Sequence, residues 1–360
     1  MLERLITVDD FERAAEAVLP RMAWDYYRSG ADDERTLRRN RRALRRWEIW
    51  YRVLVDVSRR STATTLLGAD LATPILIAPT AYHRMAHPDG ELATARAAAA
   101  AGVLYVVSTL ATTRLEDVAA ASAGPKWFQL YVHKDRGFTR ALVERAQGAG
   151  YRAVVLTVDA PILGRRLADE RNAFTLPDGL AMANLVAPDA TGSTEERSML
   201  AKYVASRHDA SLTWKDLEWL RGTTSLPLLI KGIVRADDAA RAVEHGAAAV
   251  VVSNHGARQL DGSPATIDAL PGVVAAVAGR CPVLMDGGVR SGTDVLKALA
   301  LGAAAVLVGR PILWGLAVGG EPGVARVLEI LQGELSSAMA LAGCASLADA
   351  GGDLVRRRGA

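Results

Sequence analysis

Residues 248–310 read AAVVVSNHGARQLDGSPATIDALPGVVAAVAGRCPVLMDGGVRSGTDVLKALALGAAAVLVGR and contain three short runs of apolar, mostly β-branched residues. The runs cover residues 248–254, 282–288 and 304–310, and each ends in polar residues or glycine. Continuous rather than alternating apolar runs are typical of strands buried on both faces, as in parallel sheets. The stretches between them, such as GTDVLKALALG, have the composition of helices and stop at glycine. This segment therefore predicts strands and helices that alternate.

The same pattern recurs in the preceding part of the chain. The further runs are ILIAPT (75–80), LYVVST (104–109), WFQLY (127–131), AVVLTVD (153–159) and PLLIKG (227–232). Eight strands that alternate with helices predict an α/β fold, the (β/α)8 or TIM barrel. A doubly wound sheet is the alternative, but no GxGxxG follows an early strand.

The rest of the chain is expected to decorate one barrel domain that spans residues 1–360. Residues 1–70 read as a helical cap, residues 71–320 as the barrel, and residues 321–360 as C-terminal helices and a tail. A long insertion, about residues 171–215, follows the fourth strand and therefore lies on the active-site face of a barrel. We interpret it as a lid, with a disordered surface insertion as the alternative.

Charge and composition exclude several function classes. The 360 residues hold 43 Lys and Arg against 40 Asp and Glu, a formal net charge of +3, which argues against a general nucleic-acid or membrane-surface binder. The local run RTLRRNRRALRR (35–46) could touch nucleic acid or anionic lipid, but the near-neutral total favours a helix face paired with acidic residues. Without an apolar signal region or an 18-residue apolar span, we expect a cytoplasmic protein with no membrane segment.

The predicted strand ends bring chemically useful residues into one ring, because barrel active sites lie at the carboxyl ends of the strands. These residues are Pro79, Thr80 and Ala81; Ser108; Gln129 and Tyr131; Thr157 and Asp159; Lys231; Ser253, His255 and Arg258; Asp286, Gly287, Gly288 and Arg290; and Gly309 and Arg310. The glycines and arginines after the last two strands predict a site for a phosphate-bearing ligand, with simple tight turns as the alternative.

Acid, base and cation chemistry follows from the same ring. His255 and Asp159 make a plausible base with an orienting carboxylate. Arg258 and one of Arg165 and Arg166 are candidates to bind a carboxylate, and spacing alone does not choose between the last two. Lys231 could stabilise negative charge, or else form a Schiff base.

A metal site is not expected. His83 and His87 have the i, i+4 spacing of a zinc pair, but HRMAH lacks the glutamate of HExxH and Pro88 follows it. Two cysteines, Cys281 and Cys344, are too few for a cysteine-built zinc site.

The motifs resemble those of the FMN-dependent 2-hydroxy acid oxidases and dehydrogenases, a family that includes glycolate oxidase, lactate oxidase, mandelate dehydrogenase and hydroxymandelate oxidase. They run from about residue 7 to about residue 348 and include WDYYRSGA, RNRRAL, PILIAPTAYHRMAHPDGE, WFQLYVHKDR, LTVDAPILGRR and LIKGI. The combination of SNHGARQLDG (253–262) with DGGVRSGTD (286–294) is the most specific. The resemblance implies a TIM barrel that binds FMN and oxidises a 2-hydroxy acid to the 2-oxo acid.

The resemblance also implies roles for individual residues. His255 would take a proton from the substrate hydroxyl or Cα, with Asp159 stabilising the imidazolium, and Lys231 would stabilise charge on the reduced flavin. The substrate would be bound by Arg166 and Arg258 at its carboxylate and by Tyr26 and Tyr131 at its oxygens. The residues expected to hold FMN are Pro79, Thr80, Ala81, Ser108, Gln129, Thr157, Lys231, Ser253, Asp286, Gly287, Gly288, Arg290, Gly309 and Arg310.

Leu110, in VVSTLATT, bears on the substrate because plant glycolate oxidases carry tryptophan there. A smaller side chain would widen the pocket, and Tyr82 and His83 also differ from those enzymes. We therefore expect an (S)-2-hydroxy acid oxidase for medium-chain aliphatic or aromatic, mandelate-like substrates, with O2 as the electron acceptor and H2O2 as a product.

Other functions remain open from the sequence. A dehydrogenase could use the same site and pass electrons to a quinone or a protein, and a peptide-modifying relative could act on a ribosomal peptide. A non-redox phosphate-binding barrel enzyme is a more distant alternative. The family further implies a homotetramer or homo-octamer.

Overall fold

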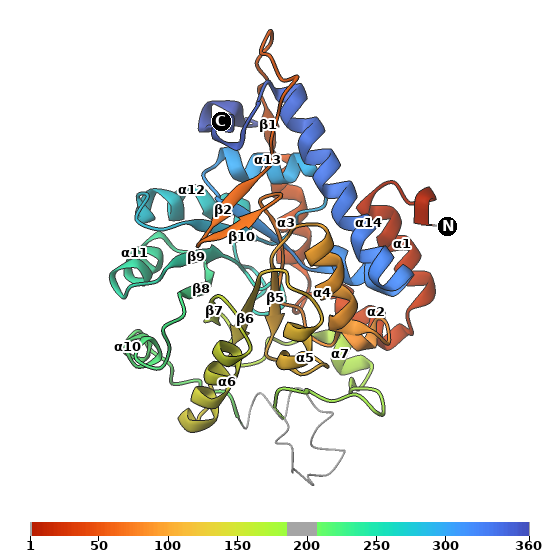
Figure 1. Cartoon of the computed structure of the whole chain (residues 1–360), viewed down its shortest axis with the longest axis vertical. Coiled ribbons are helices and arrows are strands. Elements are labelled where there is room, and N and C mark those ends of the chain that lie inside the picture. Colours follow the sequence, from red (N-terminus) through yellow and green to blue (C-terminus); the bar gives the residue numbers. More distant parts are fainter. Residues whose placement is uncertain (1, 186–206, 360) are drawn as a thin grey trace.

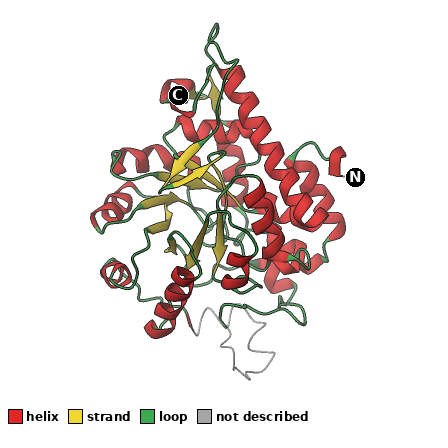
Figure 2. Cartoon of the chain, in the orientation of Figure 1, coloured by secondary structure: helices red, strands yellow, loops and turns green. Residues whose placement is uncertain are grey.

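The computed structural model describes residues 2–185 and 207–359. Its centre is a closed barrel of eight parallel strands, drawn in yellow in Figure 2, and each predicted apolar run supplies one strand. The (β/α)8 prediction is therefore confirmed. In order around the barrel the strands are β4 (Ile75–Ile77), β5 (Tyr105–Ser108), β6 (Lys126–Leu130), β7 (Val154–Thr157), β8 (Leu228–Ile233), β9 (Ala249–Val252), β10 (Val283–Asp286) and β11 (Ala305–Val308), which pairs with β4.

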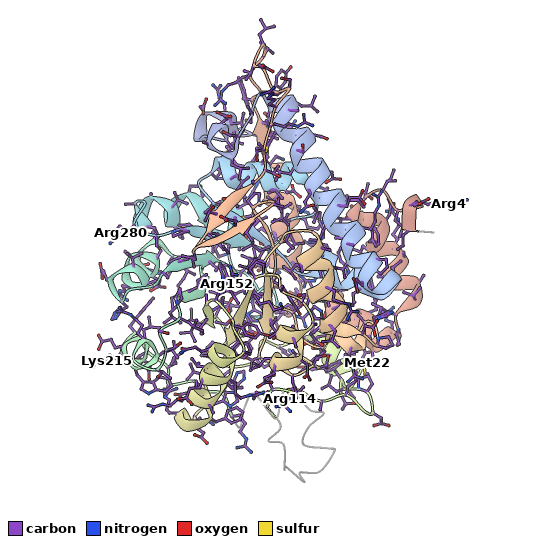
Figure 3. The ribbon with its side chains drawn as sticks, viewed as in Figure 1. Arg4, Met22, Arg114, Arg152, Lys215 and Arg280 are labelled. Atoms are coloured by element: carbon purple, nitrogen blue, oxygen red, sulfur yellow. The ribbon has the colours of Figure 1, made fainter. Side chains whose placement is uncertain are left out.

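Helices follow the strands and surround the barrel (Figure 1). Polar side chains such as Arg4, Lys215 and Arg280 lie at the outer edge of the molecule (Figure 3). Within the described residues, no helix has both the length and the apolar character needed to cross a membrane. The helices that follow the strands are α4 (Gly90–Ala100), α5 (Leu115–Ala120), α6 (Arg136–Gly148), α7 (Leu167–Arg171), α10 (Lys215–Arg221), α11 (Ala236–Glu244), α12 (Thr266–Val277), α13 (Gly292–Ala300) and α14 (Arg310–Ala342), which is kinked at Gly319 and Gly320.

A hairpin closes the amino-terminal end of the barrel. Strands β2 (Thr64–Leu66) and β3 (Ala69–Leu71) pair antiparallel and lie across the barrel in Figure 1. Their Leu66, Ala69 and Leu71 belong to the apolar cluster that fills the barrel interior, together with inward-facing strand residues such as Leu76 and Trp127. These hairpin side chains pack against the barrel interior as tightly as in other protein cores, so apolar contacts close this end of the barrel.

The N-terminal segment forms three helices, α1 (Val8–Val18), α2 (Arg21–Arg28) and α3 (Arg35–Arg45), and α1 packs along α14 (Figure 1). Two strands in this region and at the C-terminus were not expected, because charged residues interrupt the apolar ones in WEI (47–49) and VRR (355–357). β1 (Trp47–Ile49) pairs antiparallel with β12 (Val355–Arg357). Short 3-10 helices complete the description: η1 (Leu2–Arg4), η2 (His83–Met85), η3 (Leu347–Asp349) and η4 (Gly352–Leu354).

The arginine run of α3 pairs with acidic residues of the same chain, as favoured from the charge balance. Arg41 binds Asp9 at 2.8 Å, and Arg46 pairs with Asp268 on α12. The amide groups of the first turn of α3 donate to the Asp261 carboxylate, Thr36 N at 2.7 Å. The basic run therefore fastens the N-terminal helices to the barrel.

The predicted lid, about residues 171–215, is only partly described, because residues 186–206 lie outside the described ranges. Of the described part, Phe174 stacks on Tyr26 of α2 with ring centroids 4.5 Å apart. The lid function and the domain boundaries stay predictions.

Candidate active site

A cavity lies at the carboxyl ends of the barrel strands, and residues that follow every strand line it together with Tyr26 and Tyr27 of α2. This is the end at which barrel enzymes carry their active sites. Of the predicted site residues only Asp159 and Ser253 do not line the cavity. Those that do are Tyr26, Pro79, Thr80, Ala81, Ser108, Leu110, Gln129, Tyr131, Thr157, Arg166, Lys231, His255, Arg258, Asp286, Gly287, Gly288, Arg290, Gly309 and Arg310.

His255 and Asp159 form the predicted pair across the ends of β9 and β7. His255 Nδ1 lies 2.8 Å from Asp159 Oδ1, and His255 Nε2 lies 3.4 Å from the Tyr131 hydroxyl. An ionised carboxylate accepts hydrogen bonds only, so Nδ1 carries the proton and Nε2 presents a lone pair to the cavity. A Cβ on Gly232 would lie 2.7 Å from Asp159 Cβ, so the glycine of LIKGI leaves room for this carboxylate.

Burial and the neighbouring charges favour a neutral His255 and an ionised Asp159, the protonation states that a general base requires. Burial lowers the pKa of His255 below its usual value, although the Asp159 carboxylate acts in the opposite direction. Burial alone would raise the pKa of Asp159, but His255 and Lys231 more than offset it and the pKa is lowered. The histidine is therefore neutral and the aspartate ionised at neutral pH. Such an arrangement accepts a proton at Nε2 and then stabilises the imidazolium.

The backbone that carries His255 is held in an unusual conformation. His255, Gly256 and Ala257 have φ angles of 59°, 61° and 65°, in the left-handed region that costs non-glycine residues about 1–3 kcal/mol each. Asn254 stabilises the turn: its Oδ1 accepts from the Ala257 amide at 3.1 Å, and its Nδ2 donates to Asn40 Oδ1 of α3 at 2.8 Å. The N-terminal helices thus hold the turn that carries His255 in place.

Two arginines, the buried Arg166 and the partly buried Arg258, face the cavity beside this pair. Arg258 Nη1 donates to the carbonyls of Tyr26 and Ser29 at 2.7 and 2.8 Å, and its guanidinium lies 4.8 Å from the centre of the Tyr26 ring. Its Nη2 has no hydrogen-bond partner in the described part of the chain. Arg166 is 6 % exposed and lines the cavity, whereas Arg165 pairs with Glu170 on the surface. The structure therefore places Arg166, not Arg165, in the site.

Lys231 at the end of β8 is a fixed cation. Its Nζ lies 3.1 Å from Asp286 Oδ2 and donates to Ser253 Oγ at 2.9 Å. Burial would lower the pKa of Lys231, but Asp286 and Asp159 reverse the effect and raise it. A protonated amine is not a nucleophile, so the geometry favours charge stabilisation over a Schiff base. Ser253 also accepts from the His255 amide at 3.0 Å and so links the lysine to the histidine from behind the cavity wall.

The strands that precede β8 around the barrel offer amide and hydroxyl groups. Gln129 Nε2 donates to Thr157 Oγ1 at 3.0 Å, and Gln129 Oε1 accepts from Ser108 Oγ at 3.3 Å. These three side chains come from consecutive strands, β5, β6 and β7. They form a continuous polar strip on the cavity wall that can bind the edge of a planar polar ring.

Three comparisons with known proteins agree with this geometry. A family model described as FMN-dependent dehydrogenase matches residues 15–357. The chain belongs to the FMN-dependent dehydrogenase family. It is 56 % identical to L-lactate oxidase of Nostoc sp. over 354 residues, which cover 96 % of both chains, and 52 % identical to human 2-hydroxyacid oxidase 1 over 99 % of this chain and 98 % of that protein. A structure of mandelate oxidase with (S)-4-hydroxymandelic acid superposes with a TM-score of 0.91 at 47 % identity and covers 98 % of each chain.

The residues at the ends of β10 and β11 fit the FMN that this family uses. Burial lowers the pKa of Arg290 to about 10, and its Nε has no partner among the described residues. Gly287 and Gly288 have φ angles of 95° and 89°, and a Cβ on either would lie 2.9–3.2 Å from atoms of Asn40, so glycine lets this edge of the cavity pack closely against α3. Gly309 precedes the first turn of α14, where free amide groups favour an anion. A phosphate here would balance the buried positive charge.

Sequence reasoning missed several residues of the FMN-dependent enzyme's cavity. His208 lines it and stacks on Tyr131 with ring centroids 4.8 Å apart. Burial lowers its pKa to about 4, so the ring is neutral. Ile162, Leu163 and Gln259 also line the cavity. His208 does not follow a barrel strand, and no pattern in the sequence around it indicated that it would line the cavity.

Tyr82 and His83 do not line the substrate pocket, contrary to what their difference from plant glycolate oxidases suggested. We expected both, with Leu110, to shape the substrate pocket, but neither lines the cavity. Both are fully buried, and Tyr82 packs behind Tyr26 with ring centroids 5.4 Å apart. Leu110 does line the cavity. The backbone turn after β4 sends Tyr82 and His83 outward, which spacing from the strand could not reveal.

Proposed function

We propose that this FMN-dependent 2-hydroxy acid oxidase acts on medium-chain aliphatic and aromatic 2-hydroxy acids, mandelate among them, and uses O2 as electron acceptor to give H2O2. The observation that carries the proposal is a cavity wall in which Ala81, Leu110, Ile162 and Leu163 are apolar, while Arg166, Arg258 and His255 face the same space. A carboxylate bound at the arginines leaves the substrate side chain for the apolar wall.

The arginines fix the orientation of the substrate. Arg258 already satisfies Nη1 with two backbone carbonyls, so Nη2 is left for a substrate oxygen. Arg166 donates through Nε to the Arg258 carbonyl at 3.3 Å, which holds the Arg166 guanidinium against the backbone that carries Arg258. Charge-assisted bonds to a carboxylate are shorter and stronger than neutral ones. They would hold the 2-hydroxyl near His255 and the Tyr131 hydroxyl.

His255 then accepts the substrate proton at Nε2, and Asp159 stabilises the imidazolium through Nδ1. Burial raises the pKa of Tyr131, so its phenol stays protonated and can donate to a substrate oxygen. FMN, when bound, takes up the two electrons of the oxidation. Lys231 supplies the positive charge that offsets the negative charge which that uptake creates. The protein thus contributes position, proton transfer and charge stabilisation.

The apolar wall and the relatives support the choice of substrate. Leu110 is 6 % exposed and its carbonyl accepts from the Tyr82 amide at 3.3 Å, so its backbone is fixed while its side chain faces the cavity. The mandelate oxidase neighbour holds (S)-4-hydroxymandelic acid, which has an aromatic side chain. The Nostoc relative is a lactate oxidase, which supports aliphatic substrates as well.

The test compares substrates in the absence of O2. Purified enzyme is mixed with glycolate, L-lactate, (S)-2-hydroxyoctanoate or (S)-mandelate, and bleaching of the flavin absorbance is followed by stopped flow. We expect the second-order rate constant of reduction for 2-hydroxyoctanoate or mandelate to exceed that for glycolate by about 10–200-fold, since a methylene in an apolar pocket contributes about 1–3 kcal/mol. Glycolate as the best substrate would refute the proposed specificity. Admitting air then measures reoxidation, and slow reoxidation would refute O2 as the acceptor.

A variant separates the pocket from the chemistry. Leu110→Trp should lower the rate constant for mandelate by about 10-fold or more and leave that for glycolate within about 3-fold, because the indole fills the apolar wall without touching the arginines. Leu341→Trp, on an exposed face, is the matched control. Equal losses for both substrates in Leu110→Trp would remove Leu110 from the specificity argument.

We also propose a homo-oligomer. An apolar loop after β1 supports it: Trp50, Tyr51, Val53 and Leu54 are 50–104 % exposed, and exposed apolar patches mark interfaces. Size-exclusion chromatography with light scattering gives the mass directly, and a monomer at micromolar concentration would refute the proposal.

A further inference from the structure

His83 connects the cavity wall to helix α4. The imidazole is fully buried and does not line the cavity, but its Nε2 lies 2.6 Å from Oγ1 of Thr80, which does. Its Nδ1 lies 2.9 Å from Oγ1 of Thr94 on α4. The ring therefore bridges two hydroxyl groups, one at the cavity and one within the surrounding layer of helices.

The hydrogen-bond network assigns the protons along this bridge. Thr94 has one hydroxyl hydrogen, and we assign it to the Gly90 carbonyl of the same helix, which lies 3.3 Å from Oγ1. Thr94 Oγ1 is then an acceptor, so His83 Nδ1 must be the donor. A neutral imidazole has a single N–H, which leaves a lone pair on Nε2. The Thr80 hydroxyl must therefore donate to His83.

The imidazole is neutral and its position is fixed. Burial lowers the pKa of His83, although the nearby Glu91 carboxylate opposes the shift. Glu91 accepts from the His83 amide at 3.1 Å and from the Thr112 amide at 2.7 Å, which ties down the backbone on both sides of the ring. The Tyr105 ring lies against the imidazole with centroids 5.8 Å apart. A ring held at both nitrogens and on one face cannot turn over without breaking two hydrogen bonds.

A consequence for the cavity follows. Since its only hydrogen is committed to His83, the Thr80 hydroxyl cannot donate to a ligand in the cavity and can only accept. A flavin carries more N–H groups after reduction than before it. A fixed acceptor in the wall favours the form with more donors, whereas a fixed donor would favour the oxidised form.

We propose that His83 is a positioning residue that holds the Thr80 hydroxyl as a hydrogen-bond acceptor and thereby raises the reduction potential of bound FMN. Nothing in this role requires His83 to contact substrate or cofactor. The inference depends on FMN in the cavity and is independent of which 2-hydroxy acid is the substrate.

The test measures the midpoint potential of bound FMN against reference dyes, without substrate. His83→Phe keeps a ring and removes both nitrogens, which frees the Thr80 hydroxyl to donate into the cavity. We expect oxidised FMN to gain on the reduced form by about 10-fold in relative binding, a fall of about 30 mV for a two-electron couple. His87→Phe, in the same segment and outside the cavity lining, is the matched control and should leave the potential unchanged.

A double-mutant cycle separates positioning from packing. In a Thr80→Val background the hydroxyl is absent, so His83→Phe should produce no further fall in potential. An equal fall in both backgrounds, or no fall in either, would overturn the proposal. If His83→Phe does not fold, Thr94→Val takes its place: it removes the acceptor for Nδ1–H, frees the ring to donate from Nε2, and should lower the potential only while Thr80 is present. Glycolate or mandelate turnover does not enter these readings, so they stand apart from the substrate proposal.

Discussion

The two ends of the barrel are built from the same strands but bury different kinds of side chain, apolar at one end and charged at the other. At the hairpin end, Leu66, Ala69 and Leu71 seal the barrel with apolar contacts. At the active-site end, Lys231 and Asp286 are buried as a charged pair, and Asp286 Oδ1 has no hydrogen-bond partner among the described residues. At the hairpin end the burial of apolar side chains stabilises the fold. At the active-site end, charged atoms without a hydrogen-bond partner among the described residues lie where a ligand can bind them.

The active-site end also carries more left-handed backbone than the hairpin end. The turn at His255 has three consecutive left-handed residues, whereas the hairpin turn has two, Leu67 and Gly68. Such conformations and isolated charges cost free energy that the rest of the fold must offset. Changes at one end should therefore alter chemistry with little effect on stability, and changes at the other should do the reverse.

The largest effect is expected for His255→Gln. Loss of the base should slow anaerobic flavin reduction by mandelate by as much as about 10⁴-fold, the upper range for a general base. The side chain lies beside the FMN site and is not part of the apolar core, so the visible spectrum of bound FMN and the melting temperature should change little. Stopped-flow reduction and thermal unfolding measure the two quantities on one sample. Reduction at an unchanged rate would exclude His255 as the base.

Arg166 and Arg165 offer a matched pair one residue apart. Arg166→Met should lower the second-order rate constant of reduction by about 10²–10³-fold, because removing one partner of a buried charge pair costs about 2–5 kcal/mol. Arg165 is exposed and paired with Glu170, so Arg165→Met should stay within about 2-fold of the parent enzyme. Equal losses in the two variants would mean that global charge, not carboxylate binding, is responsible.

The sequence predicted the active-site end better than the hairpin end. Every barrel strand is a run of apolar residues long enough to recognise, and barrel geometry then places the residues after the strands in one ring. This reasoning predicts from the sequence alone that His255, Lys231 and Arg290 lie in one site. The hairpin was not predicted: β4 is equally short but wholly apolar, whereas polar residues interrupt the apolar ones in β2 (TTL) and β3 (ADL).

Other parts of the site could not be predicted, for physical reasons. Asn40 supports the catalytic turn from α3, more than two hundred residues away along the chain, and only the tertiary packing shows the pairing. His208 reaches the cavity from a segment that follows no barrel strand. The choice between Arg165 and Arg166 depended on the local backbone after β7, which the spacing DAPILGRR leaves open.

At the hairpin end the expected effect is on stability. Leu71→Ala removes a side chain that is 4 % exposed, and should lower the free energy of unfolding by about 2–5 kcal/mol. Chemical unfolding measures that loss, and the rate constant of flavin reduction should stay within about 2-fold. Leu341→Ala, at a 79 % exposed leucine, is the control and should change neither quantity. A large loss of activity in Leu71→Ala without a loss of stability would contradict the separation of the two ends.

The smallest effect is a shift in pH dependence, and its sign follows from the charges around His255. Burial lowers the pKa of this imidazole, and the positive charges of Lys231 and Arg166 lower it further against the opposing effect of Asp159. The acid limb of the reduction rate constant in the parent enzyme should therefore lie below pH 6.5, the ordinary value for histidine. In Arg166→Met one positive charge is gone, so the pKa of His255 should rise and the acid limb should move toward neutral pH by less than about one unit. Arg165→Met should leave the limb in place, because its charge is on the surface. The profiles are measured as single-turnover reduction from pH 5 to 9. An acid limb that moved to lower pH in Arg166→Met would contradict the assigned electrostatics, because the loss of a nearby positive charge raises the pKa of an imidazole.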